Sequence, residues 1–142
     1  MSAAAAIAVA VSFVWTGMVL AISFLETPLK FKAPGVTLTV GLGIGKVVFG
    51  ALNRVEAVLA LVLAAIVVLT MPSAAVIASA ALAIVVYVLQ VAVVRPRMRR
   101  RTNQALSGKR TRRSRLHLIF VGTEVLKVIA LCAAGFALPL TA

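Results

Sequence analysis

Acidic residues, cysteine and histidine are scarce in this chain. Its 142 residues include three acidic residues, one cysteine and one histidine. A single cysteine excludes a disulfide-stabilised fold, and His117 and Cys132 together cannot supply the four ligands of a tetrahedral zinc site. Aspartate is absent, and no glutamate lies within one helical turn of His117. The sequence therefore predicts neither an enzyme nor a metal or cofactor site.

Apolar residues dominate what is present. They make up 63% of the chain and charged residues 13%, whereas soluble domains have about 45–50% and about 25%. Because a membrane-spanning helix needs about 20 mostly apolar residues, the chain predicts a single all-α domain over residues 1–142, an integral membrane four-helix bundle. Proline disfavours helix, so the turn at Pro72 divides the longest apolar run. The expected spans are residues 3–25, 53–70, 73–94 and 116–138.

Residues 36–52 allow two interpretations, because this apolar stretch is interrupted by four glycines and by Lys46. A fifth span would reverse the orientation of every later connection and place the most basic one outside the cell. We therefore expect an interfacial helical segment, amphipathic or broken, that leads into the second span. Gly41 and Gly45 have the spacing typical of a close helix contact.

The connection over residues 95–115 contains ten of the 15 basic residues and no acid. Basic connections stay on the cytoplasmic side, so we expect a multi-pass protein of the inner (plasma) membrane with both termini outside. The connection has no aromatic residues on which bases stack, so nucleic acid is not an expected partner. Anionic lipid headgroups are expected instead. The headgroup-binding candidates are Arg95, Arg97, Arg99, Arg100, Arg101, Lys109, Arg110, Arg112, Arg113 and Arg115.

Charged residues also lie inside the expected spans. Glu124 and Lys127 are three residues apart and share a helix face, whereas Arg54 and Glu56 are two apart and do not. Glu56 therefore needs a partner from another helix. Glu56 and Glu124 each lie 14 residues from the outer end of their span, which is about 21 Å by helical rise, so we expect them to share a depth in the cytoplasmic half of the bilayer.

A charge at the centre of a bilayer costs about 2.5–3.5 kcal/mol on insertion scales, so such side chains usually face the bundle interior. We expect them to converge on a polar pocket open to the cytoplasm. They either neutralise one another and hold helices together or bind a substrate, ion or proton, and the sequence leaves both alternatives open. The candidate pocket residues are Asn53, Arg54, Glu56, Tyr87, Gln90, Thr123, Glu124 and Lys127.

Three short motifs carry a family resemblance: Phe-Val-Trp-Thr-Gly-Met at residues 13–18, Pro-Leu-Lys-Phe at 28–31 and Asn-Arg-Val-Glu at 53–56. With them, the chain resembles small bacterial membrane proteins related to transmembrane protein 205 and, more distantly, the copper-resistance D group. The resemblance implies a four-helix membrane domain with relatives linked to metal or drug resistance. Metal-handling relatives carry histidine in their helices, and the first three spans here have none, so copper chemistry is not carried over.

Two functions fit this architecture. The first is a small transporter or export factor that uses the polar pocket. Four helices leave little room for a pathway, so such a transporter is expected to be a homo-oligomer. The alternative is a non-catalytic accessory subunit that joins a larger membrane complex through its helices and basic connection.

Overall fold

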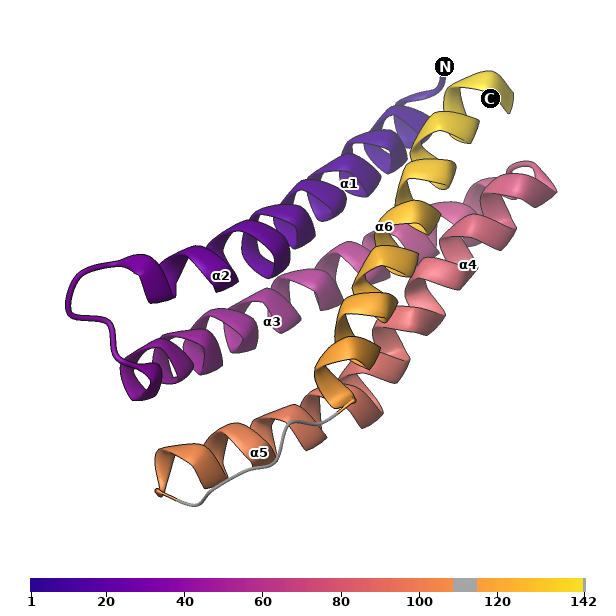
Figure 1. Ribbon diagram of the computed structural model, residues 1–142. Helices are drawn as coiled ribbons and strands as arrows, with labels where there is room; N and C mark the ends of the chain where they lie inside the picture. Colours follow the sequence, from indigo (N-terminus) through magenta and orange to yellow (C-terminus); the bar gives the residue numbers. More distant parts are fainter. Residues whose placement is uncertain (109–114, 142) are drawn as a thin grey trace.

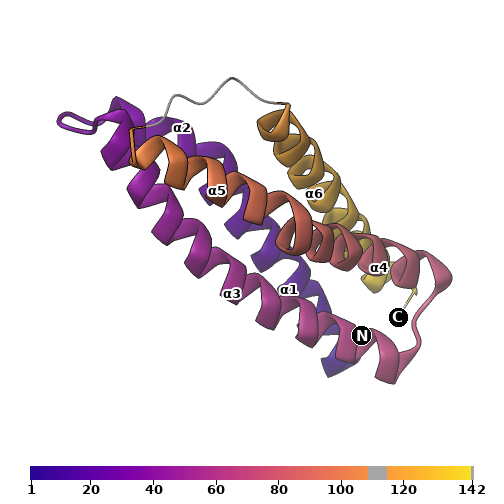
Figure 2. The same ribbon diagram turned by 90° about the horizontal axis from the view of Figure 1, so that it is seen from below.

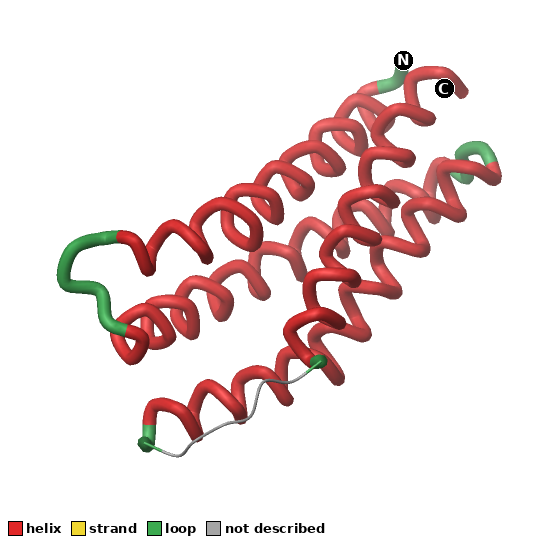
Figure 3. The backbone as a smooth tube through the Cα atoms, viewed as in Figure 1, coloured by secondary structure: helices red, strands yellow, loops and turns green. Residues whose placement is uncertain are grey.

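The structure is a computed structural model that describes residues 1–108 and 115–141. Its described residues form helices and turns without any strand (Figures 1 and 3). Four helical segments are long and apolar enough to cross a membrane: Ala3–Lys32, Leu38–Thr70, Ala74–Leu106 and Leu116–Thr141. The predicted all-α helical bundle is confirmed, and the length and composition of its helices are those of a multi-pass membrane protein.

Two of the four segments combine several kinds of helix. The first consists of α1 (Ala3–Val19), the π-helical η1 (Leu20–Glu26), α2 (Thr27–Leu29) and the 3₁₀-helical η2 (Lys30–Lys32). The second is α3 (Leu38–Thr70). The third consists of α4 (Ala74–Leu89), the π-helical η3 (Gln90–Val94) and α5 (Arg95–Leu106), and the fourth is α6 (Leu116–Thr141).

The helices form a ring in which α1 and α4 each pack against both α3 and α6. Figure 1 shows both termini and the α3–α4 turn at one end of the bundle, with the connection to α3 and the tip of α5 at the other. Every charged side chain belongs to residues 26–56 or 95–127. We therefore call the end with the termini the uncharged end and the opposite end the basic end.

Local signals determine where the helices begin and end. Ser2, Thr37 and Ser73 precede α1, α3 and α4, and each side chain accepts a hydrogen bond from a backbone N–H in the first turn. Such N-caps satisfy donors that have no partner within the helix. Helix α3 ends at Met71, whose left-handed backbone (φ 44°, ψ 61°) reverses the chain into α4.

Pro28 and Pro96 lie inside helical segments, each two residues after the end of a π-helical stretch. Proline lacks an N–H and its ring crowds the carbonyl four residues earlier, and a wider π turn relieves both conflicts. The first and third segments therefore continue past residues 25 and 94, where the sequence analysis ended them. The prediction that the basic connection begins at residue 95 is wrong, because Arg95–Leu106 is the helix α5.

Helix α3 also corrects the interpretation of residues 36–52. From Leu38 onward these residues belong to one uninterrupted helix with no boundary near Asn53, so they form neither a fifth span nor a separate interfacial segment. Its 33 residues correspond to about 50 Å by helical rise, which exceeds the roughly 30 Å of a hydrocarbon core. At the basic end, Lys46 of α3 donates to Oδ1 of Asn103 in α5 at 2.8 Å, and Figure 2 shows α5 beside α3.

The glycine spacing in α3 does mark a close contact. Gly41 and Gly45 are both buried. A Cβ at Gly41 would overlap the ring of Phe31, and one at Gly45 would lie 2.9 Å from Nζ of Lys30. These glycines therefore let η2 pack directly against the backbone of α3.

The bundle core combines alanines with a few large side chains. Trp15, Leu63 and Leu131 are fully buried among the alanines of α1, α4 and α6. Many other large apolar side chains, such as Leu61 and Leu69, point outward. Apolar surface of this kind faces lipid in a membrane-spanning bundle, whereas the ionisable side chains described next face inward.

Candidate functional site

Lys127 is the centre of a buried ion network between the helices. Its Nζ donates to Oε1 of Glu56 at 2.5 Å, to Oε1 of Gln90 at 2.8 Å and contacts Oε1 of Glu124 at 2.6 Å. An ammonium group has three donors, so each has an acceptor here. Lys127 therefore connects α6 to α3 and to η3.

Glu56 receives donors from three other helical elements. Nη2 of Arg95 in α5 donates to its Oε2 at 2.7 Å, and Nε1 of Trp15 in α1 donates to its Oε1 at 2.9 Å, beside the bond from Lys127. The expectation that Glu56 finds its partners on other helices is confirmed. Arg54, two residues away, is exposed and does not take part.

Glu124 is held by its own helix and by both π-helical stretches. Ser23 of η1 donates to its Oε2 at 2.6 Å, and Nε2 of Gln90 in η3 donates to its Oε1 at 2.7 Å. The same Gln90 nitrogen lies 2.8 Å from Oγ1 of Thr123. Ser23 and Gln90 belong to η1 and η3, so the two π-helical stretches also supply two polar members of the site.

The network is closed and its formal charges balance. Glu56, Glu124 and Lys127 have no exposed surface, and Arg95 is 8% exposed. Two carboxylates face two cations, so no net charge is buried. Removing a single member would leave an unpaired charge in a low-dielectric interior, which is far more costly than the intact cluster. The sequence predicts a pocket open to the cytoplasm, whereas the structure packs these side chains against one another.

The other predicted pocket residues lie at the edge of the network. Tyr87 is buried, donates to the backbone carbonyl of Asn53 at 2.9 Å and packs edge-to-face on Trp15. Asn53 itself is half-buried, and its Oδ1 has no hydrogen-bond partner among the described residues. Of the predicted set, Glu56, Gln90, Glu124 and Lys127 therefore form the network, and Asn53 and Tyr87 adjoin it.

Sequence reasoning missed Trp15, Ser23 and Arg95 as members. Neither Trp15 nor Ser23 is among the candidate pocket residues that the sequence predicts. Arg95 is the first basic residue after 38 uncharged positions. This position at a membrane boundary was the signal that could have identified it as a member of the network. Its expected contact with lipid headgroups stays a prediction, and the structure shows that its Nη2 pairs with Glu56, because α4 and α5 belong to one continuous helical segment.

The remaining headgroup candidates divide into two groups. Arg97, Arg99, Arg100 and Arg115 are exposed, and Arg101 is half-buried. Lys109, Arg110, Arg112 and Arg113 lie outside the described residues. Exposed arginines at the basic end are compatible with contact to headgroups, which stays a prediction.

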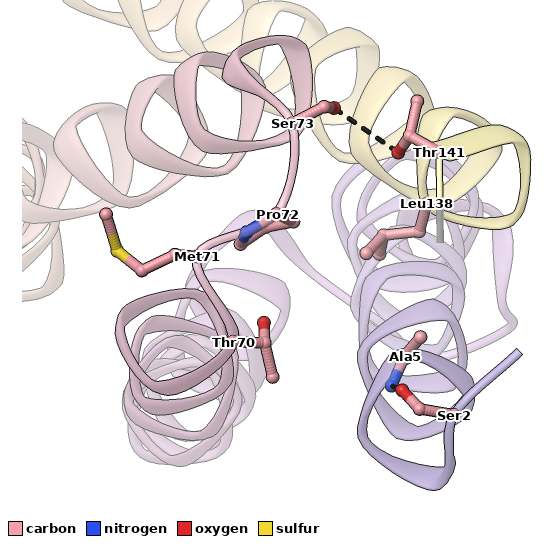
Figure 4. Close-up of a pocket in the computed structure, with 8 residues that line it drawn as sticks. All are labelled: Ser2, Ala5, Thr70, Met71, Pro72, Ser73, Leu138 and Thr141. Carbon is pink, nitrogen blue, oxygen red and sulfur yellow. Dashed lines mark hydrogen bonds between the residues drawn. The ribbon is translucent and has the colours of Figure 1, made fainter.

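A cavity of about 430 Å³ lies at the uncharged end, between the start of α1, the α3–α4 turn and the end of α6 (Figure 4). Its hydroxyl groups bond mainly to the backbone of their own helices, and one bond, from Ser73 to Thr141 at 3.3 Å, crosses between α4 and α6. None of the described residues that line it is charged. The cavity therefore offers only weak polar contacts to a ligand.

Among the described residues, no three His, Cys, Asp or Glu side chains come together in a way that could hold a metal ion. Comparison of the chain with protein-family models, curated protein sequences and solved structures finds no match. The resemblance to the transmembrane protein 205 relatives stays a prediction, and the network is interpreted from its own geometry.

Proposed function

We propose that this chain is a small membrane transport or export protein, and that the buried ion network is its working site. The observation that carries the proposal is the position of Lys127, which is fully buried and shared between carboxylates of two different helices. Ionisable groups inside a membrane are rare and usually mark an ion, proton or substrate pathway. The proposed activity is transport without catalysis of a chemical reaction.

The proposed mechanism uses competition for one ammonium group. A proton that binds Glu124 removes the charge that holds Lys127 on that side, so Lys127 pairs more strongly with Glu56. Loss of the proton restores the shared arrangement. Glu56 and Glu124 lie on α3 and α6, so this exchange changes how tightly the two helices are held together.

The proposed orientation places the basic end in the cytoplasm and both termini outside the plasma membrane. Its support is the charge distribution, since every Lys and Arg belongs to residues 26–56 or 95–127 and basic connections are retained on the inner side. Exposed arginines of α5 then lie next to anionic headgroups.

The test is proton movement in proteoliposomes that contain a pH-sensitive dye and carry an imposed pH gradient. We expect wild-type protein to dissipate the gradient faster than protein-free liposomes, and Glu56→Gln to abolish the difference. Arg54→Gln is the matched control, because it removes an exposed charge from the same helix and should leave the rate unchanged. A wild-type rate equal to that of empty liposomes would contradict the proposal.

A second candidate is a non-catalytic subunit of a larger membrane complex, or of a homo-oligomer. This candidate is favoured by the exposure of α3. Only 22% of its most apolar 18-residue stretch is buried, compared with 39% of the corresponding stretch of α6. A helix with so much free surface has room for another subunit. Stoichiometric co-purification with a larger membrane protein, together with an absence of proton movement, would favour this candidate.

A further inference from the structure

Arg95 is a buried cation with spare hydrogen-bond donors. Its side chain is 9% exposed, and Nη2 is used by Glu56. Its Nε and Nη1 are also buried but have no hydrogen-bond partner among the residues that the structure describes. Buried N–H groups are almost always paired, and an orphaned one requires an explanation.

The chain has no carboxylate left to serve these donors. It contains only three acidic residues. Glu26 pairs with Lys30 at 3.6 Å, Glu124 pairs with Lys127, and Glu56 already accepts from Lys127, Trp15 and Arg95. All three acidic side chains are therefore already paired, and Nε and Nη1 are available to an acceptor from outside the chain.

The surroundings of Arg95 select against cations. The net charge of the chain is +12, and the exposed Arg97, Arg99 and Arg100 follow Arg95 on α5; such a field concentrates anions. The ring of Phe49 lies 6.0 Å from the guanidinium carbon, which is a cation–π distance. A planar guanidinium with free N–H groups matches the oxygens of both carboxylate and phosphate, and phosphate is the one of the two that every phospholipid headgroup carries.

The depth of Arg95 fits a phosphate at the membrane surface. Arg95 follows Ala74, the first residue of α4 at the uncharged end, by 21 residues. This corresponds to about 30 Å of helix, which is about the thickness of a hydrocarbon core. The backbone of Arg95 is therefore close to headgroup level on the basic side, and its guanidinium reaches Glu56 at 2.7 Å.

We propose that Arg95 binds a phosphate oxyanion, supplied either by free phosphate or by a lipid headgroup, at the basic entrance to the ion network. The bound oxygens accept from Nε and Nη1, while Nη2 stays on Glu56. As a statement about substrate, this inference rests on the proposed function and names an anion as the ligand class. Binding itself does not require transport, so it can be tested separately.

The first arm of the experiment measures fluorescence of Trp15, the single tryptophan of the chain, in nonionic detergent. Trp15 donates to the same carboxylate as Arg95, so it reports on occupation of the site. We expect a saturable change with inorganic phosphate at constant ionic strength. The second arm uses native mass spectrometry to compare retention of phosphatidylglycerol with retention of phosphatidylcholine.

Arg95→Lys is the test variant, because it keeps the charge that Glu56 requires but removes the guanidinium donors. We expect at least about tenfold weaker binding, since charge-assisted hydrogen bonds to phosphate are among the strongest in proteins. Arg99→Lys, an exposed position one turn further along α5, is the matched control and should bind as wild type does. Circular dichroism checks that both variants remain helical.

The outcomes separate the two sources and the two proposals. A phosphate response that is lost in Arg95→Lys supports a free anion, and selective loss of bound phosphatidylglycerol supports a headgroup. No saturable response of wild-type protein to either probe means that only water fills the site and overturns the inference, even if Arg95→Lys fails to fold. Equal binding by both variants also overturns it. Proton movement without phosphate binding would retain the proposed function alone.

Discussion

The uncharged end and the ion network satisfy the hydrogen bonds of their polar groups in opposite ways. At the uncharged end, hydroxyls such as Thr70 and Thr141 bond to carbonyls one turn earlier in their own helices. In the network, Glu56 and Glu124 bond to side chains from other helical elements. Local bonds form whenever a helix forms, whereas cross-helix bonds need the whole bundle. The comparison teaches that side-chain packing stabilises the uncharged end, whereas ion pairs and charge-assisted hydrogen bonds stabilise the region of the ion network.

The largest test of this contrast removes one charge from the network. We expect Glu56→Gln to lower the free energy of unfolding by about 3–5 kcal/mol, because it leaves Arg95 and Lys127 with a single carboxylate. Unfolding in mixed micelles followed by circular dichroism measures the change. Arg54→Gln should cost almost nothing, and Glu56→Gln combined with Arg95→Gln should recover part of the loss. Equal stability of Glu56→Gln and wild type would mean that charge balance is unimportant here.

A smaller effect is expected where α1 meets the network. Trp15→Phe removes the N–H that donates to Glu56, and a hydrogen bond to a buried charged group contributes about 1.5–3 kcal/mol. The same unfolding measurement reports the loss. Val14→Ala, at an exposed position on the same helix, should change stability far less, and a similar loss in both variants would argue against a role for the indole N–H.

Packing by shape is tested at Gly135 in α6. A Cβ there would lie 2.8 Å from the ring of Phe13, whereas one at Gly122 of the same helix meets nothing within 4 Å. Gly135→Ala should therefore destabilise by about 1–3 kcal/mol through overpacking. Gly122→Ala should be neutral or stabilising, because alanine favours helix. Thermal unfolding of the two variants compares them directly, and the opposite order would refute this packing.

The smallest expected effect is a gain at the α3–α4 turn. Met71 has a left-handed backbone (φ 44°), which strains any residue with a Cβ. Met71→Gly should raise the free energy of unfolding by about 0.5–1 kcal/mol after the entropic cost of glycine. Ser107→Gly, at a helix end with φ −86°, should instead lower it. A loss of stability in Met71→Gly would show that its side chain matters more than its backbone.

The sequence predicted features that depend on local spacing. Four apolar runs gave the helices, and the three-residue spacing of Glu124 and Lys127 predicted their ion pair, which is present at 2.6 Å. The two-residue spacing of Arg54 and Glu56 correctly indicated that Glu56 pairs elsewhere. All of these follow from the 3.6-residue period of a helix.

Features that depend on tertiary contacts or helix distortion could not be predicted. Trp15 and Glu56 are 41 residues apart, and nothing in the pattern of either segment selects the other. A proline normally ends a helix, so Pro96 concealed the continuity that carries Arg95 into the bundle. A run of arginines also looks the same whether its first member faces headgroups or a buried carboxylate.

The unbroken course of α3 determines which parts of the molecule can move. Lys46 and Glu56 attach the same helix to α5 at two points, ten residues or about 15 Å apart along its axis. Two separated contacts along one helix oppose both rotation and sliding of α3 relative to α5. We therefore expect α3 and α5 to move together. Motion relative to this pair of helices is then expected where α1 and α6 pack against the rest of the bundle. Lys127 belongs to α6 and pairs with Glu56 of α3. A change of its partner therefore acts where α6 can move relative to the other helices.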